Sequence, residues 1–311
     1  SKSTKSISSN TMIDIHPFLL KDFYKVDHRR QYPQGINHIY SNMTARMSRV
    51  YYSDKIIPFG IQAMLMEYFI RQWNQNFFEK RLDAALAPYK RIIDNSLKSK
   101  RITYDHVAQL HELGYLPLVV KAIPEGSLVD MKIPFMTSYS THDDFAWIVN
   151  SFETLESASI WQPSTSASTA FFYRLLFERY AKMTGASKDF VKYQAHDFSM
   201  RGMPGVEAAC MSGGGHLLSF VGTDTIPAIP YLEHYYGANS DNELVGTSIF
   251  ATEHSVMCMG GPEGEFDIYH RLLTEVYSDE EFFSVVSDTY NLWRVLTDYL
   301  PRLKEIIMAR T

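Results

Sequence analysis

The sequence predicts an α/β protein in which an N-terminal α+β domain (residues 11–145) precedes the first part of an irregular (β/α) barrel-like domain (residues 146–311). The first part shows no regular alternation of helix-like and strand-like stretches. In the second part, four apolar stretches read as strands, and a helix-like stretch follows each. The residues that end them lie 27, 30 and 34 residues apart, about the length of one strand-plus-helix unit: Asp197, Asp224, His254 and Asp288.

The elements of the first domain follow from periodicity and from turn residues. Residues 11–58 mix short strands and turns. Apolar residues then recur at helical spacing from Ile61 to Phe69, which predicts an amphipathic helix. The remaining predictions are a helix over 79–97 that Pro88 breaks or kinks, a short helix from Asp105 to Gly114, and strands over 116–123 and 127–131 around the turn Pro124-Glu125-Gly126.

The second domain opens with a long predicted helix. Residues 163–166 offer N-caps for it, and Gly185 offers a C-cap. About four strand–helix units follow, with strands over 193–198, 217–223, 247–253 and 283–287. The run Gly213-Gly214-Gly215 does not have the spacing of a phosphate-binding loop, so we interpret it as a helix C-cap and tight turn.

Composition narrows the class of protein. The chain is 45% hydrophobic and 21% charged, and its net charge of −5 favours neither nucleic-acid nor membrane binding. Cys210 and Cys258 are too few for a disulfide framework and are typical of the reducing cytoplasm. No apolar run approaches the roughly 20 residues that span a bilayer. The polar residues 1–10 predict a disordered tail.

His254 is the strongest candidate for chemistry because its neutral imidazole at a strand end can act as a base, a ligand or a nucleophile. Glu253 precedes it, and Asp288 ends the next predicted strand, where a carboxylate could orient the ring. A lone histidine would more often be a hydrogen-bonded loop residue. These two carboxylates favour a functional role.

Other strand-end residues admit two interpretations. Asp197, Asp224 and Asp288 can each cap a helix as well as serve a site. Phe198 could stack on a planar ligand, and Arg201 could bind an acyl or phosphate oxygen. The sequence has no His-x-His pair, so it predicts no tightly bound metal, whereas Mg²⁺ held through substrate phosphates stays open.

Six strings in fixed order carry a resemblance to the nicotinamide phosphoribosyltransferase family, of type II phosphoribosyltransferases, from about residue 14 to residue 311. Each string is weak alone, and the six in order are specific. They are Asp22-Phe23-Tyr24-Lys25, Lys121 to Gly126, His196-Asp197-Phe198 with Arg201-Gly202, Gly222 to Thr225, Glu253-His254-Ser255, and Val285 to Asp288.

The resemblance implies a reaction and its participants. The family joins nicotinamide to phosphoribosyl pyrophosphate with Mg²⁺, giving nicotinamide mononucleotide and pyrophosphate, and couples ATP hydrolysis through a phosphohistidine. His254 matches that histidine, with Glu253 beside it and Asp288 as its partner. Family members are homodimers with the active site at the subunit interface.

The resemblance also assigns the substrate-binding residues. Phe198 matches the ring under nicotinamide, Asp224 the acceptor for the amide NH₂, and Arg201 a donor to the amide oxygen. Tyr24 matches the ring on the other face, contributed by the second subunit. Asp22, Arg46 and Ser248 complete the implied substrate-binding set.

Family members are longer and continue into motifs that hold the ribose and phosphates, so we expect this chain to be the N-terminal part of the family's length. Three alternatives stay open: a nicotinate-preferring relative, against which Asp224 argues; a non-catalytic nicotinamide-binding fragment; and an unrelated barrel lyase or hydrolase.

Overall fold

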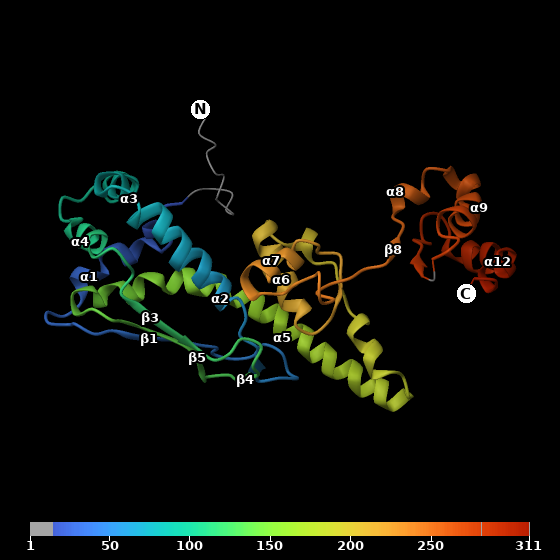
Figure 1. Cartoon of the computed structure of the whole chain (residues 1–311), viewed down its shortest axis with the longest axis horizontal. Helices are drawn as coiled ribbons and strands as arrows, with labels where there is room; N and C mark the ends of the chain where they lie inside the picture. The colour runs from blue at the N-terminus through green and yellow to red at the C-terminus, as the bar shows by residue number, and fades with distance from the viewer. Residues whose placement is uncertain (1–14, 281, 311) are drawn as a thin grey trace. The chain divides into compact units, whose positions relative to one another are not determined.

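The computed structural model describes residues 15–280 and 282–310, and the predicted tail over residues 1–10 lies outside them (Figure 1). The chain is a mixed α/β protein of two compact units, one ending at Gly246 and the other beginning at Thr247. No helix within the described ranges combines the length and the apolar character that crossing a bilayer requires.

The boundary between the two units differs from the predicted boundary at residues 145/146. The reason is that one long helix packs against elements that precede this position in the sequence and against elements that follow it. Helix α5 contacts an earlier helix and strand as well as a later helix. These elements are α5 (Glu153–Thr184), α2 (Ile61–Met64), β2 (Lys55–Ile56) and α6 (Val206–Leu217). The first unit therefore includes both the α+β part and the first two predicted strand–helix units.

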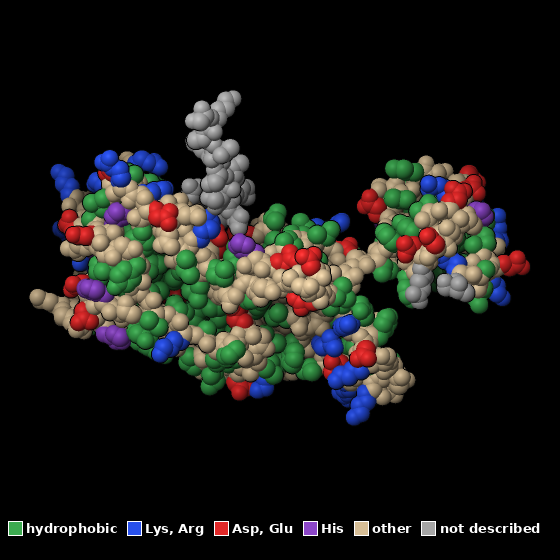
Figure 2. Space-filling model, in the orientation of Figure 1, with side chains coloured by type: hydrophobic (Ala, Val, Ile, Leu, Met, Phe, Trp, Pro, Cys, Tyr) green, Lys and Arg blue, Asp and Glu red, His purple; other side chains and the backbone are tan. Residues whose placement is uncertain are grey.

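Helix α5 begins ten residues earlier than predicted, and Pro163 lies inside it. The serines that looked like caps instead bind neighbouring segments. Ser164 Oγ accepts the Phe59 N–H at 3.0 Å, and Ser166 Oγ donates to the Ser212 carbonyl oxygen at 2.6 Å. The predicted end is confirmed, because Gly185 caps the helix in the left-handed conformation. Basic side chains gather beside its C-terminal part (Figure 2), and Lys182 lies in its last turn, where a positive charge complements the helix dipole.

The α+β part is built on a three-stranded antiparallel sheet in the order β1-β5-β3, with strands Tyr40–Thr44, Pro134–Ser140 and Leu118–Ala122. A two-stranded ladder pairs β2 with β4 (Val129–Asp130). The predicted strands over 116–123 and 127–131 are thus confirmed in shortened form. The helical elements around them are η1 (Pro17–Leu19), η2 (Phe23–Asp27), α1 (His28–Gln31), η3 (Leu65–Arg71), η4 (Asn74–Phe78), α3 (Leu82–Leu97), α4 (Asp105–Leu113) and η5 (Asp143–Phe152).

An aromatic core holds this part together. Trp73 and Phe77 lie 5.2 Å apart between ring centroids, and Phe18 lies 4.9 Å from Tyr89. All four rings are almost completely buried. Such rings bury about 150–250 Å² each, so they dominate the packing energy of this region. The helix predicted from the periodicity that starts at Ile61 is longer in the structure, where it continues from α2 through η3 and η4. It therefore also supplies Trp73 and Phe77.

The carboxylate of Glu125 joins three parts of the first unit. It lies in the predicted turn after β3 and accepts the backbone N–H groups of Gly60, Ile61 and Gln62 at 2.6–3.1 Å. It also accepts the hydroxyl of Tyr236 at 3.0 Å. The carboxylate therefore caps α2, whose first N–H groups have no partner within the helix.

The three glycines 213–215 lie inside α6, so the predicted C-cap and turn there are wrong. They are needed for close packing. A Cβ on Gly215 would lie 2.7 Å from the Pro163 carbonyl oxygen, and one on Gly213 would lie 2.7 Å from the Ala228 Cβ. The trio lets α6 approach both α5 and α7 (Ala228–Tyr236).

The four predicted strands of the second part are present but contain only two residues each. They form two parallel pairs: β6 (His196–Asp197) with β7 (Gly222–Thr223), and β8 (Phe250–Ala251) with β9 (Phe283–Ser284). Tyr193, where the first predicted strand starts, ends the 3-10 helix η6 (Lys188–Tyr193), and Leu217, where the second starts, ends α6. Outside β6 and β7, the other residues of these two predicted strands lie in turns and irregular segments. A further short turn, η7 (Met200–Gly202), follows β6.

The second unit packs short helices around its own core. Met257, Tyr269, Val295, Tyr299 and Leu303 are almost completely buried there. The helical elements are α8 (His254–Met257), α9 (Gly261–Arg271), η8 (Leu272–Val276), α10 (Leu292–Arg294), η9 (Val295–Tyr299), α11 (Leu300–Arg302) and α12 (Lys304–Met308).

Candidate active site

The first group of candidate residues lies where β6 and β7 end. The parallel pairing sets His196 beside Gly222 and Asp197 beside Thr223. Beyond the pairing, His196 Nε2 lies 2.6 Å from Asp224 Oδ1. Asp197 is buried, and its Oδ1 accepts the Ser199 N–H at 2.9 Å. The strand ends thus present a histidine–carboxylate pair on a supported turn.

Gly222 makes this arrangement possible. A Cβ at that position would lie 2.8 Å from His196 Nδ1 and 3.0 Å from the Ala195 carbonyl oxygen. We expect Gly222→Ala to push the His196 ring away from Asp224 and to lower the free energy of unfolding by about 1–3 kcal/mol, as overpacking does. Denaturant unfolding would measure the loss, and imidazole NMR would detect the broken hydrogen bond. Gly202→Ala is the control, because a Cβ there meets nothing within 4 Å; equal losses in both variants would contradict the prediction.

A cavity of about 510 Å³ opens beside this pair. Phe198, Arg201 and Asp224 all line it, together with the start of α6 at Val206. The Phe198 side chain is 65% exposed, and its ring centroid lies 4.8 Å from that of His196. An aromatic face, a guanidinium and a carboxylate therefore border one pocket that could hold a planar ligand with both donor and acceptor groups.

The contact between His196 and Asp224 was not predicted, because His196 entered the sequence analysis only within the His196-Asp197-Phe198 string. Both residues stand at the ends of strands that were predicted to follow one another. Consecutive parallel strands bring such ends together, so this placement was a usable signal.

Asp22 and Tyr24 lie elsewhere on the first unit and are not among the residues that line the Phe198 cavity. Asp22 precedes η2 and accepts the Thr154 hydroxyl at 2.7 Å. The Tyr24 ring is 61% exposed and meets the edge of His28. Lys25, which is buried, forms an ion pair with Glu153 and so anchors this segment on α5. The roles of Asp22 and Tyr24 stay predictions.

Glu156 lies beside this anchor and is 5% exposed. Burial, reinforced by the nearby Glu153, raises the pKa of Glu156 to about 7, while Lys25 opposes the shift. Because the folded pKa lies above the unfolded one, the stabilisation from this group is complete below about pH 4.5 and is lost as the pH rises through 7. We expect Glu156→Gln to unfold with roughly 3 kcal/mol more free energy than the parent protein at pH 8, and with little difference at pH 4.5. Urea unfolding at both pH values tests this, and a pH-independent difference would contradict it.

Arg46 is likewise not among the residues that line the Phe198 cavity. Arg46 is exposed just after β1 and lines a separate depression with Tyr51, Tyr52 and Lys132. Ser248 is exposed near the start of the second unit. Their roles in substrate binding stay predictions.

The second unit holds the other group of candidates. His254 opens α8, and its Nε2 lies 2.9 Å from Asp288 Oδ1. Parallel pairing of β8 and β9 brings the two residues together, and Thr252 Oγ1 accepts the Val286 N–H at 3.0 Å to fix the register. Both side chains are well exposed, at 63% and 69%. Glu253 precedes the helix and accepts the Ser255 hydroxyl. The carboxylate engages one ring nitrogen, so Nδ1 is the atom through which the ring can act as a nucleophile.

Comparisons with known proteins bear on both groups. Residues 17–120 match the family model described as nicotinamide phosphoribosyltransferase, N-terminal domain, and residues 193–311 match the nicotinate phosphoribosyltransferase (NAPRTase) family. A nicotinamide phosphoribosyltransferase of Acinetobacter baylyi is 46% identical over 302 residues, which are 96% of this chain and 59% of that protein. One of Mycoplasma genitalium is 33% identical over 93% of this chain and 63% of its own length.

The chain belongs to the nicotinamide phosphoribosyltransferase family. It spans about 60% of the length of these relatives. A solved nicotinate-nucleotide pyrophosphorylase from Pyrococcus furiosus shares the fold with a TM-score of 0.58 at 13% identity, covering 99% of this chain and 60% of that one. Human nicotinic acid phosphoribosyltransferase gives a TM-score of 0.50 at 17% identity, over 77% of this chain and 40% of its own.

Proposed function

We propose that the protein to which this chain belongs transfers a phosphoribosyl group to nicotinamide, in NAD salvage. The observation that carries the proposal is the Phe198 cavity, which gathers Phe198, Arg201 and Asp224 in a chain of this family. The activity for which these relatives are named and the chemistry of this pocket agree. The products would be nicotinamide mononucleotide and pyrophosphate.

The pocket chemistry suits nicotinamide. Its flat, neutral ring would stack on Phe198, the amide NH₂ would donate to Asp224, and the amide oxygen would accept from Arg201. The carboxylate of Asp224 would repel the negatively charged carboxylate of nicotinate. His196, by holding Asp224 at 2.6 Å, would fix the direction of that carboxylate.

The transfer itself needs positioning more than acid–base chemistry. The pyridine nitrogen would attack C1 of phosphoribosyl pyrophosphate while the C1–O bond breaks and pyrophosphate leaves with the bonding electrons. Charge develops on the ribose ring and on the leaving group, so orientation and neutralisation lower the barrier. Mg²⁺ would enter with the substrate phosphates and neutralise them.

ATP coupling would run through His254. Nδ1 would attack the γ-phosphorus of ATP, the bond to the bridging oxygen would break, and ADP would leave. Asp288, hydrogen-bonded to Nε2, would stabilise the positive ring as the new N–P bond forms. The added negative charge would then act on the phosphate site, and hydrolysis would restore the histidine.

The remaining parts of the proposal concern the whole protein. Tyr24 and Arg46 would reach the active site of a second subunit in a cytoplasmic homodimer, and Asp22 would be a further residue of the nicotinamide pocket. Glu253 would act beside His254, and Ser248 would contact substrate. The two parallel strand pairs would belong to an irregular (β/α) barrel that the remainder of the relatives' length completes.

The test is product formation by the protein from nicotinamide, phosphoribosyl pyrophosphate and Mg²⁺, with and without ATP. We expect nicotinamide mononucleotide, in larger yield with ATP, and nicotinamide preferred over nicotinate in direct competition. A preference for nicotinate would replace this proposal by the nicotinate-using alternative. Nicotinamide binding without product, in protein of the relatives' full length, would favour a non-catalytic binding role.

A further inference from the structure

A second pocket of about 350 Å³ lies in the first unit between η3, α6 and α7. Its walls are largely apolar, with Ala63, Met64, Met211, Pro227 and Tyr231 among them. Val206 is the residue that it shares with the Phe198 cavity, and the two pockets are otherwise lined by different residues. Its volume falls within the range of about 300–1,000 Å³ that small-molecule sites occupy.

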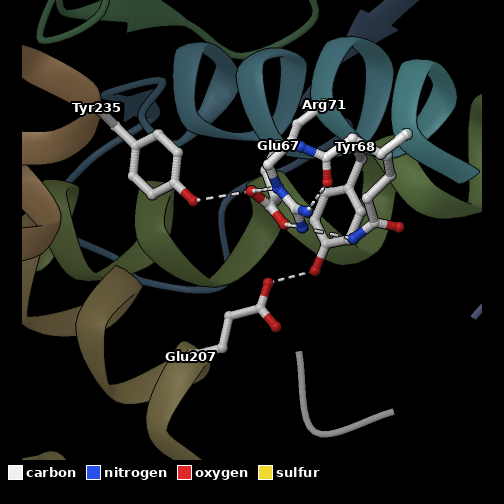
Figure 3. A network of polar contacts seen from close by, with 7 residues as sticks. Glu67, Tyr68, Arg71, Glu207 and Tyr235 are labelled. Atoms are coloured by element: carbon white, nitrogen blue, oxygen red, sulfur yellow. Dashed lines mark hydrogen bonds and ion pairs between the residues drawn. The ribbon is translucent and has the colours of Figure 1, made fainter. Parts of the chain in front are cut away.

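Polar groups converge on this pocket from two sides (Figure 3). Glu67, which is 5% exposed, accepts from Arg71 Nε at 2.8 Å and from the Tyr235 hydroxyl at 3.2 Å. From α6, Glu207 accepts the hydroxyl of Tyr68. Burial alone would raise the pKa of Glu67, but Arg71, Gln72 and Tyr235 bind the carboxylate and hold its pKa below the usual range. Glu67 is therefore ionised at neutral pH.

The balance of charge in the pocket is negative. Two carboxylates, Glu67 and Glu207, line it, and no lysine or arginine stands among the described residues that do so. The guanidinium of Arg71 is taken up by Glu67 and by Gln75. Glu207 is exposed, so its carboxylate can meet a ligand at the rim. The rings of Tyr68, Tyr231 and Tyr235 offer aromatic faces to a cation.

We propose that this pocket binds a small molecule that joins an apolar body, about the size of one ring, to a protonated amine. The apolar body lies against Met64, Met211 and Tyr231, and the ammonium group donates to Glu207. Neutral or anionic molecules of the same shape bind more weakly because they leave the Glu207 carboxylate without a compensating charge. This proposal is independent of the nicotinamide reaction.

Cys210 provides the probe, because it lines the pocket and Cys258 is the one other cysteine of the sequence. Burial, followed by the charge of Glu207, raises the pKa of the Cys210 thiol, so labelling with a chromogenic disulfide is best followed in mildly alkaline buffer. In Cys258→Ser protein, we expect benzylamine to slow Cys210 labelling in a saturable way. Benzyl alcohol, benzoate and nicotinamide are not expected to do so.

Glu207→Gln supplies the matched variant, and Glu112→Gln on α4 is the control at an exposed site. We expect the first to weaken benzylamine protection by about tenfold and the second to leave it unchanged. Saturation-transfer NMR of benzylamine is the second measurement. Equal protection by benzoate, an unchanged affinity in Glu207→Gln, or no benzylamine signal in either measurement would each overturn the proposal.

Discussion

Phosphorylation by ATP is expected to disappear in His254→Ala protein, and with it the gain in product yield that ATP brings. The imidazole is the nucleophile in the proposed coupling, so its removal leaves no atom to accept the phosphoryl group. The measurement is incorporation of label from γ-³²P-ATP, with acid-labile and base-stable behaviour as the signature of phosphohistidine. Basal transfer without ATP should survive, because His254 takes no part in the proposed bond changes at C1.

Two further variants test whether His254 is the labelled residue and whether Asp288 assists it. His270→Ala removes an exposed histidine from α9 in the same unit and should label like the parent protein. Asp288→Asn keeps the size of the side chain but loses the charge that stabilises the ring, so labelling should slow by about 10- to 100-fold rather than vanish. Phosphorus NMR should assign the phosphate to Nδ1. Full labelling of His254→Ala, or phosphate on Nε2, would contradict the mechanism.

Asp224→Ala is expected to lower kcat/KM for nicotinamide by about 10- to 100-fold and to reduce the preference over nicotinate. The reason is the loss of a charge-assisted hydrogen bond to the amide, worth about 1.5–3 kcal/mol when buried by the ligand. Initial rates with each base, taken separately and in competition, give both quantities. Asp241→Ala, at an exposed loop position, is the control.

His196→Ala separates two explanations of that loss. It keeps the carboxylate but removes the group that holds it at 2.6 Å. If Asp224 contacts the amide itself, His196→Ala should cost less activity than Asp224→Ala and should retain the preference for nicotinamide. Equal effects on rate and preference would show that Asp224 acts only through the histidine, against the proposed contact.

Much of the first unit was predictable because local signals and tertiary packing agree there. The helix that ends at Gly114 and the strands around Glu125 appear as expected. The start of α5 was not, since Ser164 and Ser166 are N-cap residues by type but bind the distant Phe59 and Ser212. A cap and a tertiary hydrogen bond use the same hydroxyl, and one sequence does not distinguish them.

The candidate site shows the same limit. The contact of His254 with Asp288 and the shared cavity of Phe198, Arg201 and Asp224 follow from strand ends that the sequence marks. The packing role of glycines 213–215 could not be predicted from the sequence, because it depends on how closely α5 and α7 approach α6. The pocket beside Glu67 was missed for a similar reason: its walls come from segments more than 100 residues apart.

The Glu125 carboxylate has a consequence for how the protein is made. During synthesis α2 leaves the ribosome long before Glu125 does, so its first N–H groups lack their acceptor until the turn after β3 has been translated. Tyr236 completes the arrangement later still, a further 111 residues along the chain. A nascent chain paused after α2 and before Glu125 has been translated would hold an uncapped α2, and chaperones or proteases would have access to this part of the first unit during that interval.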